Sequence, residues 1–260
     1  PRSETSAALL NDRIYVTGGY YGLSVSPSSV VLSSVMCYNV GRGEWSLAAS
    51  LNNARTNHST VALNGQLYII GGWNQVSLSS MEMYDIKENK WILMDRRCDM
   101  KEPRYNFSTI TIDNQYIYVF GGNEKKLCER FDNSSNTWTS TADMKHVRTQ
   151  AGVIRLSSDI IAVMGGGDEN NNSVDTIALY NIRSNTWTDA DFKLPVPLSR
   201  FAAWMIDGYG IVIAGIVIAG GITTGYYSHY KTYQLDITNG SKTWTEICDA
   251  PYSLSYSAFV

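Results

Sequence analysis

Paired glycines recur along this 260-residue chain at nearly regular intervals. They stand at Gly18-Gly19, Gly71-Gly72, Gly121-Gly122, Gly165-Gly166 and Gly220-Gly221. Each pair is followed by an aromatic residue and then a tryptophan: Tyr38 and Trp45, Tyr84 and Trp91, Phe131 and Trp138, Tyr180 and Trp187, Tyr233 and Trp244. A self-similar period of about 50 residues indicates that one supersecondary unit is repeated along the chain.

Each copy of the repeat predicts two β-hairpins. Asn64-Gly65 separates two short apolar stretches, and Gly or Asn stands two residues before each of the first four tryptophans. Both features are typical of tight turns, because these residue types tolerate positive φ. We therefore expect four antiparallel strands per copy, with the glycines ending the second strand, the aromatic residue on the third and the tryptophan on the fourth. The bulky rings are expected to fill the wedge between neighbouring sheets, and glycine allows their backbones to approach closely.

The segments YIIGG (68–72) and MYDIKENKW (83–91) closely resemble the kelch repeat of β-propellers. The resemblance covers essentially the whole chain and implies an all-β fold, a kelch β-propeller forming a single domain over residues 1–260. Five complete four-stranded blades are expected at about residues 2–50, 54–99, 103–144, 147–196 and 199–250. Residues 252–260 (YSLSYSAFV) match the start of a repeat and predict the inner strand of a sixth, closing blade, whose other strands would precede Pro1.

The apolar stretch 208–221 contains the five residues IVIAG twice in succession. It is shorter than the roughly 20 residues that a membrane-spanning helix requires, and its glycines and β-branched residues favour a buried strand. We assign it to the second strand of the fifth blade, where one copy of IVIAG is surplus. The extra residues must bulge or extend past the sheet end, because an odd insertion reverses which side chains face the core.

Composition excludes several classes of function. The chain carries 21 basic and 24 acidic residues without a basic stripe, which argues against nucleic-acid binding. Its four cysteines lack CxxC spacing and are expected to be free thiols in a reducing compartment. We find no signal peptide or lipidation motif and expect a cytoplasmic protein without membrane contact. His58, His146 and His229 lie in different repeats without metal-ligand spacing, so we expect no metal, no cofactor and no catalytic residues.

The rim formed by the second-to-third strand loops and the links between blades varies most in length, and such loops commonly carry binding residues. Arginines recur where the first strand begins, at Arg2, Arg55, Arg104, Arg148 and Arg200, and Tyr252 takes that place in the last copy. The glycines are followed at this rim by Tyr20, by Trp73 and Asn74, and by Asn123. The resemblance implies that these ten residues contact a partner at the mouth of the central channel. The alternative for each arginine is a structural ion pair with an acid of a neighbouring blade.

The resemblance further implies a non-catalytic protein–protein interaction module that recognises a peptide or loop with acidic or hydrogen-bonding groups. Many kelch propellers are substrate receptors of cullin–RING ubiquitin ligases, which here would require a domain outside this chain. Other kelch proteins bind actin and the cytoskeleton, which is one alternative. A sugar-processing, mutarotase-like enzyme with an arginine and a carboxylate in the channel is another.

Overall fold

The computed structural model describes residues 2–22, 30–206, 215–219, 222–224, 227–229, 231–236 and 243–249. Within these ranges the regular structure consists of β-strands and one 3-10 turn, η1 (Arg96–Cys98). By its internal contacts the chain divides into two compact units. Unit 1 contains the described residues up to Val119 together with Glu129–Ser140, and unit 2 contains Phe120–Cys128 and the described residues from Thr141 onward.

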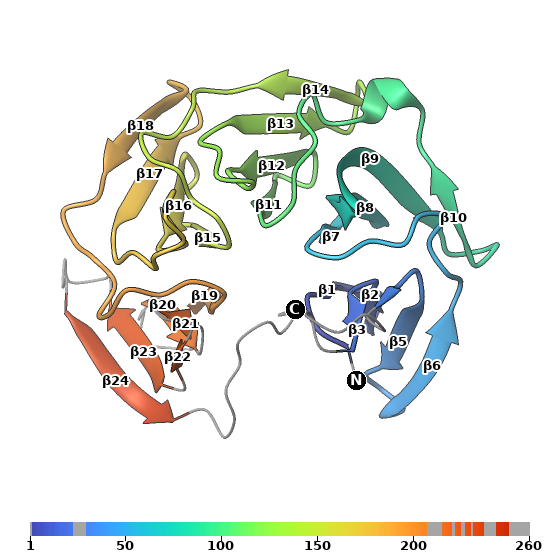
Figure 1. Ribbon diagram of the computed structural model, residues 1–260, viewed down its shortest axis with the longest axis horizontal. Helices are drawn as coiled ribbons and strands as arrows, with labels where there is room; N and C mark the ends of the chain where they lie inside the picture. The colour runs from blue at the N-terminus through green and yellow to red at the C-terminus, as the bar shows by residue number, and fades with distance from the viewer. Residues whose placement is uncertain are drawn as a thin grey trace. The chain divides into compact units, whose positions relative to one another are not determined.

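Three four-stranded antiparallel sheets belong to unit 1, although Phe120 and Cys128 of the third sheet are part of unit 2 (Figure 1). The first sheet has the order β1 (Ser6–Leu10), β2 (Arg13–Thr17), β5 (Val35–Asn39) and β6 (Glu44–Ala48). The second is built from β7 (Ser59–Leu63), β8 (Gln66–Asn74), β9 (Val76–Asp85) and β10 (Lys90–Leu93). The third consists of β11 (Ser108–Ile112), β12 (Tyr116–Phe120), β13 (Cys128–Asp132) and β14 (Thr137–Ser140). A short ladder joins β3 (Tyr20–Tyr21) to β4 (Val30–Val31).

Unit 2 contains two further four-stranded sheets. The fourth sheet comprises β15 (Gly152–Arg155), β16 (Ile160–Met164), β17 (Ile177–Asn181) and β18 (Thr186–Asp189). The fifth sheet comprises β19 (Ala202–Ile206), β20 (Gly215–Ala219), β23 (Lys231–Asp236) and β24 (Trp244–Asp249), and β21 (Ile222–Thr223) pairs with β22 (Tyr227–Ser228) beside it. The predicted all-β class and its four-stranded repeat are confirmed. Strand β20 contains most of the second IVIAG copy, whereas residues 207–214 and the predicted closing strand 252–260, with Tyr252, lie outside the described residues.

The double glycines join successive sheets. The N–H of Gly72 donates to the carbonyl of Arg104, which begins the next repeat, at 2.9 Å. A Cβ on Gly71 would lie 2.8 Å from that same carbonyl oxygen, and a Cβ on Gly72 would lie 2.8 Å from the carbonyl oxygen of Thr56. Both glycines also have positive φ, +55° and +101°. Only glycine combines this backbone conformation with so close an approach, as the sequence predicted.

Trp91, Trp138 and Trp187 lie between sheets as predicted, whereas Trp45 is 54% exposed and does not. Trp91 is 5% exposed, packs against Tyr84 with ring centroids 4.8 Å apart, and donates from Nε1 to the carbonyl of Ala49 at 3.0 Å. Trp138 donates in the same way to Cys98 in unit 1, and Trp187 to Ala142 in unit 2. Each ring therefore buries its apolar body and satisfies its one donor on the link that precedes its own sheet.

Candidate partner-binding surface

Two of the predicted binding arginines lie in the interior of unit 1. Arg55 is 0% exposed, and its guanidinium donates from Nη2 to Oε1 of Glu82 at 2.8 Å and from Nη1 to the carbonyl of Gly71 at 2.7 Å. The same carboxylate accepts the N–H of Asn52 at 2.8 Å. Arg104, also 0% exposed, is paired with Glu129. Each ion pair therefore ties the link between two sheets to the third strand of the following sheet.

Arg148 is held in unit 2 by neutral acceptors. It is 3% exposed and donates from Nη1 to the carbonyls of Gly165 at 2.6 Å and Thr176 at 3.0 Å. Ala178 stands at the strand position that Glu82 occupies in the second sheet. Because burial disfavours the charged form, the pKa of Arg148 is lowered to about 10.

Burial decides the role of these arginines. Arg55, Arg104 and Arg148 offer almost no surface to a partner, so the structure does not support their predicted direct contact and favours a structural role. The role differs from the expected ion pair with a neighbouring blade, because the acids that hold Arg55 and Arg104 belong to the same repeat and Arg148 is held by carbonyls. Arg2 occupies the same register, is half-buried, and donates to the carbonyls of Gly18 at 3.2 Å and Ser34 at 3.0 Å. It too serves mainly to hold the end of the second strand.

Arg200 does not belong to this register. The N–H of Gly19 donates to the carbonyl of Arg55 at 2.8 Å, and the N–H of Gly166 donates to that of Leu198 at 2.8 Å. Leu198, 1% exposed, therefore stands where the other repeats place an arginine, and Arg200 follows two residues later. The alignment of Arg200 with the other arginines was wrong by two residues.

Each of the five repeats has a polar residue at the position equivalent to Arg200. This recurring position was not identified from the sequence. Its members are half-buried, and all have φ between +51° and +58°: Glu4, Asn57, Asn106, Gln150 and Arg200. Within each unit the backbones of these residues link the segments that precede the first strands, because the N–H of Asn57, Asn106 and Arg200 donates to the carbonyl of the preceding member. The observed pairs are Asn57 to Glu4 at 3.1 Å, Asn106 to Asn57 at 3.1 Å and Arg200 to Gln150 at 2.9 Å. Left-handed backbone is costly for Glu4, Gln150 and Arg200 and less so for Asn57 and Asn106, so the hydrogen bonds fix a conformation that is sparsely populated for three of the five residues.

The unit 1 surface, as we define it, consists of Glu4, Tyr20, Asn57, Trp73, Asn74 and Asn106, all of which are half-buried. Oε2 of Glu4 accepts from Nδ2 of Asn57 at 2.8 Å and from the hydroxyl of Thr56 at 3.1 Å. The backbone of Trp73 pairs with Thr56, and β8 continues through Asn74 to a hairpin turn at Gln75, where φ is +62°. Trp73 and Asn74 are therefore carried by regular β-structure, which favours a preformed surface.

The unit 2 surface, as we define it, consists of Asn123, Gln150 and Arg200, all of which are half-buried. Gln150 and Arg200 line a polar recess with a volume of about 20 Å³, enough for roughly one water molecule. Nε of Arg200 donates to Oε1 of Gln150 at 2.6 Å across this recess. On its floor the hydroxyl of Ser173 lies 3.0 Å from that of Ser199 and donates to the carbonyl of Ile222 at 2.9 Å. Asn123, with φ of +48°, is half-buried in the same unit. The recess suits one small hydrogen-bonding group rather than a whole ligand.

The two surfaces differ in charge. A carboxylate, Glu4, lies on the unit 1 surface and a guanidinium, Arg200, on the unit 2 surface. In the part of the chain that the structure describes, no three His, Cys, Asp or Glu side chains are placed to hold a metal. The arrangement can bind polar groups through amide, hydroxyl and charged side chains beside the rings of Tyr20 and Trp73.

A family model described as the KLHDC2/KLHL20/DRC7 Kelch-repeats domain matches residues 1–122. Kelch-like protein 25 of Xenopus tropicalis is 26% identical over 278 residues, covering 100% of this chain and 43% of that protein. Kelch-like protein terF of Aspergillus terreus is 26% identical over 280 residues, covering 96% of this chain and 57% of that protein. The comparisons support a kelch-repeat family. The resemblance to the kelch repeat that the sequence shows is thereby confirmed.

The chain spans about two fifths to three fifths of the length of these two relatives. A third relative, Kelch-like protein 26 of Danio rerio, is 29% identical over 205 residues, or 75% of this chain and 32% of that protein. Among the described residues no helix is long and apolar enough to cross a membrane.

Proposed function

We propose that this chain is a non-catalytic protein-recognition module that binds a peptide or loop of a partner, and that the unit 1 surface and the unit 2 surface are each, taken separately, a candidate for that binding. The observation that carries the proposal is the series of polar side chains at Glu4, Asn57, Asn106, Gln150 and Arg200, each held at positive φ by backbone hydrogen bonds. Strain of this kind is concentrated at ligand-binding sites, where it fixes side chains before binding. The kelch-like relatives support a protein as the partner.

The chemistry of the surfaces refines the expected partner. With Arg55, Arg104 and Arg148 buried, the predicted row of guanidiniums is absent from the described surface. Asn57, Asn74 and Asn106 instead offer amides, which both donate and accept and therefore suit the main chain of an extended segment. Arg200 can hold one carboxylate of the partner as a forked donor. Tyr20 and Trp73 contribute rings that bury apolar area at low entropic cost.

A role as the substrate receptor of a cullin–RING ubiquitin ligase is the most specific form of this proposal. It rests on the resemblance to kelch-like proteins and requires a ligase-binding domain outside this chain. A cytoplasmic location belongs to the same proposal. The partner segment would then be the substrate's recognition sequence.

Affinity purification with quantitative mass spectrometry tests the proposal. The baits are the wild-type chain, Trp73→Ala, Arg200→Gln and, as a control, Lys90→Ala at the start of β10, at the opposite end of the strands. We expect at least one protein to be retained by wild type and by Lys90→Ala and lost with Trp73→Ala or Arg200→Gln. If all four folded baits retain the same proteins, neither surface is the recognition site.

A further inference from the structure

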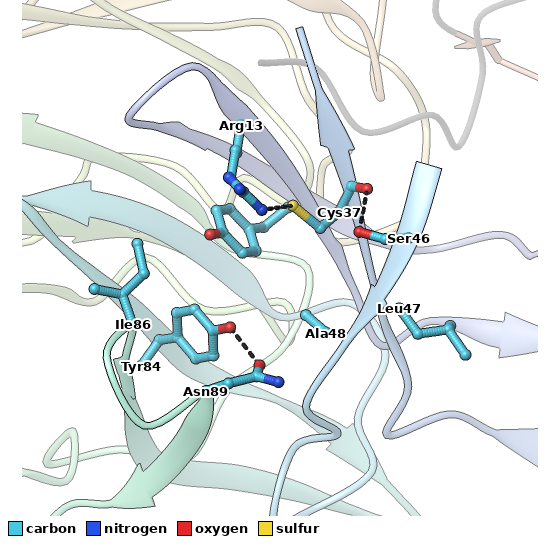
Figure 2. A pocket seen from close by; sticks show the side chains of 9 residues that line it. Arg13, Cys37, Ser46, Leu47, Ala48, Tyr84, Ile86 and Asn89 are labelled. Atoms are coloured by element: carbon cyan, nitrogen blue, oxygen red, sulfur yellow. Dashed lines mark hydrogen bonds between the residues drawn. The ribbon is translucent and has the colours of Figure 1, made fainter. Parts of the chain in front are cut away.

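A cavity of about 280 Å³ opens in unit 1 at the ends of the strands opposite the unit 1 surface (Figure 2). Strand β2 contributes Arg13 from its first position, and β5 and β6 contribute Cys37, Ser46 and Ala48. Asn89, from the turn between β9 and β10, lies on the side formed by the second sheet. The function proposed above uses none of these residues.

Small side chains create this cavity. Cys37 pairs across the strands with Ser46, and the equivalent pair in the second sheet is Met83 with Ile92. Two residues after Ser46 on β6, Ala48 occupies the position that Met94 occupies in the second sheet. Met83 and Met94 pack against the core between the second and third sheets, so the space that they fill there is open here. The opening between the first and second sheets thus has no counterpart in the core between the second and third sheets.

Arg13 supplies a cation without a matching anion. Figure 2 shows its guanidinium directed at the thiol of Cys37, and Nη1 lies 4.0 Å from Sγ. Sulfur is a weak acceptor and does not neutralise a guanidinium. Within the described residues, no Asp or Glu oxygen forms an ion pair with Arg13, and no Asp or Glu lines the cavity. Arg13 is exposed, so solvent also reaches its guanidinium, which is available to pair with an anion that enters the cavity.

The opposite wall supplies a second donor. Oδ1 of Asn89 accepts from the hydroxyl of Tyr84 at 2.6 Å (Figure 2). It also accepts from the N–H of Ala49 at 3.0 Å. With the oxygen occupied twice, the Nδ2 group of Asn89 is the part of the amide left to bind a ligand. Burial raises the pKa of Tyr84, so its phenol stays neutral and adds no negative charge that would repel an anion.

We propose that this cavity binds a small organic acid, with the carboxylate held by Arg13 and Asn89 and a ring or short branched alkyl group against Tyr84 and Ala48. Arginine holds carboxylates through two parallel hydrogen bonds, which fixes the ligand's orientation. A dry cavity of about 150 Å³ is large enough for benzene, so the present volume leaves room for a ring and its carboxylate. The ligand class is therefore that of benzoate-sized monocarboxylic acids.

Calorimetric titration of the purified chain with benzoate and with uncharged benzamide tests the proposal. We expect benzoate to bind with a dissociation constant of roughly 1 mM or below and benzamide about tenfold more weakly. Gln66 stands in the second sheet at the position equivalent to Arg13. Arg13→Gln should therefore weaken the affinity for benzoate about tenfold and leave the affinity for benzamide unchanged. Ala48→Met, which copies Met94, should abolish binding of both without lowering the melting temperature. Arg97→Gln, at an exposed ion pair with Asp95, is the matched control and should change neither affinity.

Thiol labelling gives a second readout. Bound benzoate should slow alkylation of Cys37 by N-ethylmaleimide, measured by peptide mass spectrometry, and leave alkylation of the exposed Cys248 unchanged. The proposal is overturned if acetate, benzoate and phenylacetate all fail to bind at about 10 mM. It is equally overturned if Arg13→Gln binds benzoate as wild type does, or if the rate at Cys37 is unaffected by bound benzoate.

Discussion

The guanidinium of Arg55 and the carboxylate of Glu82 meet at 2.8 Å with neither side chain exposed to solvent. The pair does more than neutralise two charges, since Glu82 also accepts the N–H groups of Asn52 at 2.8 Å and Asn53 at 3.1 Å. The link that leads from the first sheet into the second is therefore fastened by one carboxylate. Removing either partner leaves a buried charge whose desolvation is no longer compensated.

Arg55→Ala should accordingly lower the free energy of unfolding by about 3–5 kcal/mol. Lys145→Ala removes a cation that is 66% exposed and paired with Asp189, so it should cost about 1 kcal/mol or less. Urea denaturation of both variants provides the comparison. A loss of partner binding in folded Arg55→Ala, without loss of stability, would instead support the direct contact predicted from the sequence.

Gly72→Ala tests the joint between sheets. Its Cβ would lie 2.7 Å from the Cβ of His58 and 2.8 Å from the carbonyl oxygen of Thr56, at a φ of +101°. Backbone must shift to admit it, so we expect a loss of stability of about 3 kcal/mol or more. Gly65→Ala is the matched control, because Gly65 has φ of +70° but no atom within 4 Å of its added Cβ. That variant should lose only about 1 kcal/mol, from backbone strain alone. If thermal denaturation shows the same loss of stability for both variants, the close approach of the backbones at Gly72 does not contribute to stability.

His58 predicts a specific pH dependence of stability. Its Nε2 lies 2.7 Å from the hydroxyl of Thr17, and burial lowers its pKa from 6.5 to about 3. The unfolded chain therefore binds a proton below pH 6.5 that the folded chain does not, and stability falls as the pH drops below 6.5. The contribution approaches about 1.4 kcal/mol per pH unit between roughly pH 6 and 4. His58→Gln should remove this slope, which is measured as the difference between the two proteins in urea midpoints at each pH. Parallel pH profiles would contradict the assignment.

The sequence predicted the features that repeat. Gly71-Gly72, Trp91 and the Asn64-Gly65 turn were identified correctly because each recurs at a fixed spacing for one physical reason: backbone approach, wedge filling or positive φ. The arginines recur just as regularly, which is typical of a structural residue. The sequence alone could not distinguish their burial from exposure at the rim, because the acids that hold Arg55 and Arg104 are distant in sequence.

One signal for the correct register was present. The distance from arginine to the first glycine is 16 residues in two repeats (2 to 18 and 55 to 71) and 17 in two others (104 to 121 and 148 to 165). From 200 to 220 the distance is 20 residues, or 15 once the five surplus residues are left out. From 198 to 220, with the same five residues left out, it is 17, as in two of the other repeats. The cavity at Arg13 had no comparable signal, because it depends on which residues are small at one pair of sheets.

The corrected register makes a last prediction about the unit 2 surface. Arg200→Gln removes a half-buried guanidinium beside Gln150, so the proposed partner should bind more weakly by about 1–3 kcal/mol while stability changes little. Leu198→Ala removes a side chain that is 1% exposed in the core of unit 2, which should cost about 2–5 kcal/mol of stability and leave the affinity of the folded protein unchanged. Binding of wild type should also weaken more with added salt than binding of Arg200→Gln, because the lost contact is an ion pair. Fluorescence titrations at two salt concentrations, with thermal denaturation of the same samples, separate the two residues. If instead Leu198→Ala lowers affinity and Arg200→Gln does not, Arg200 has no place in the recognition surface.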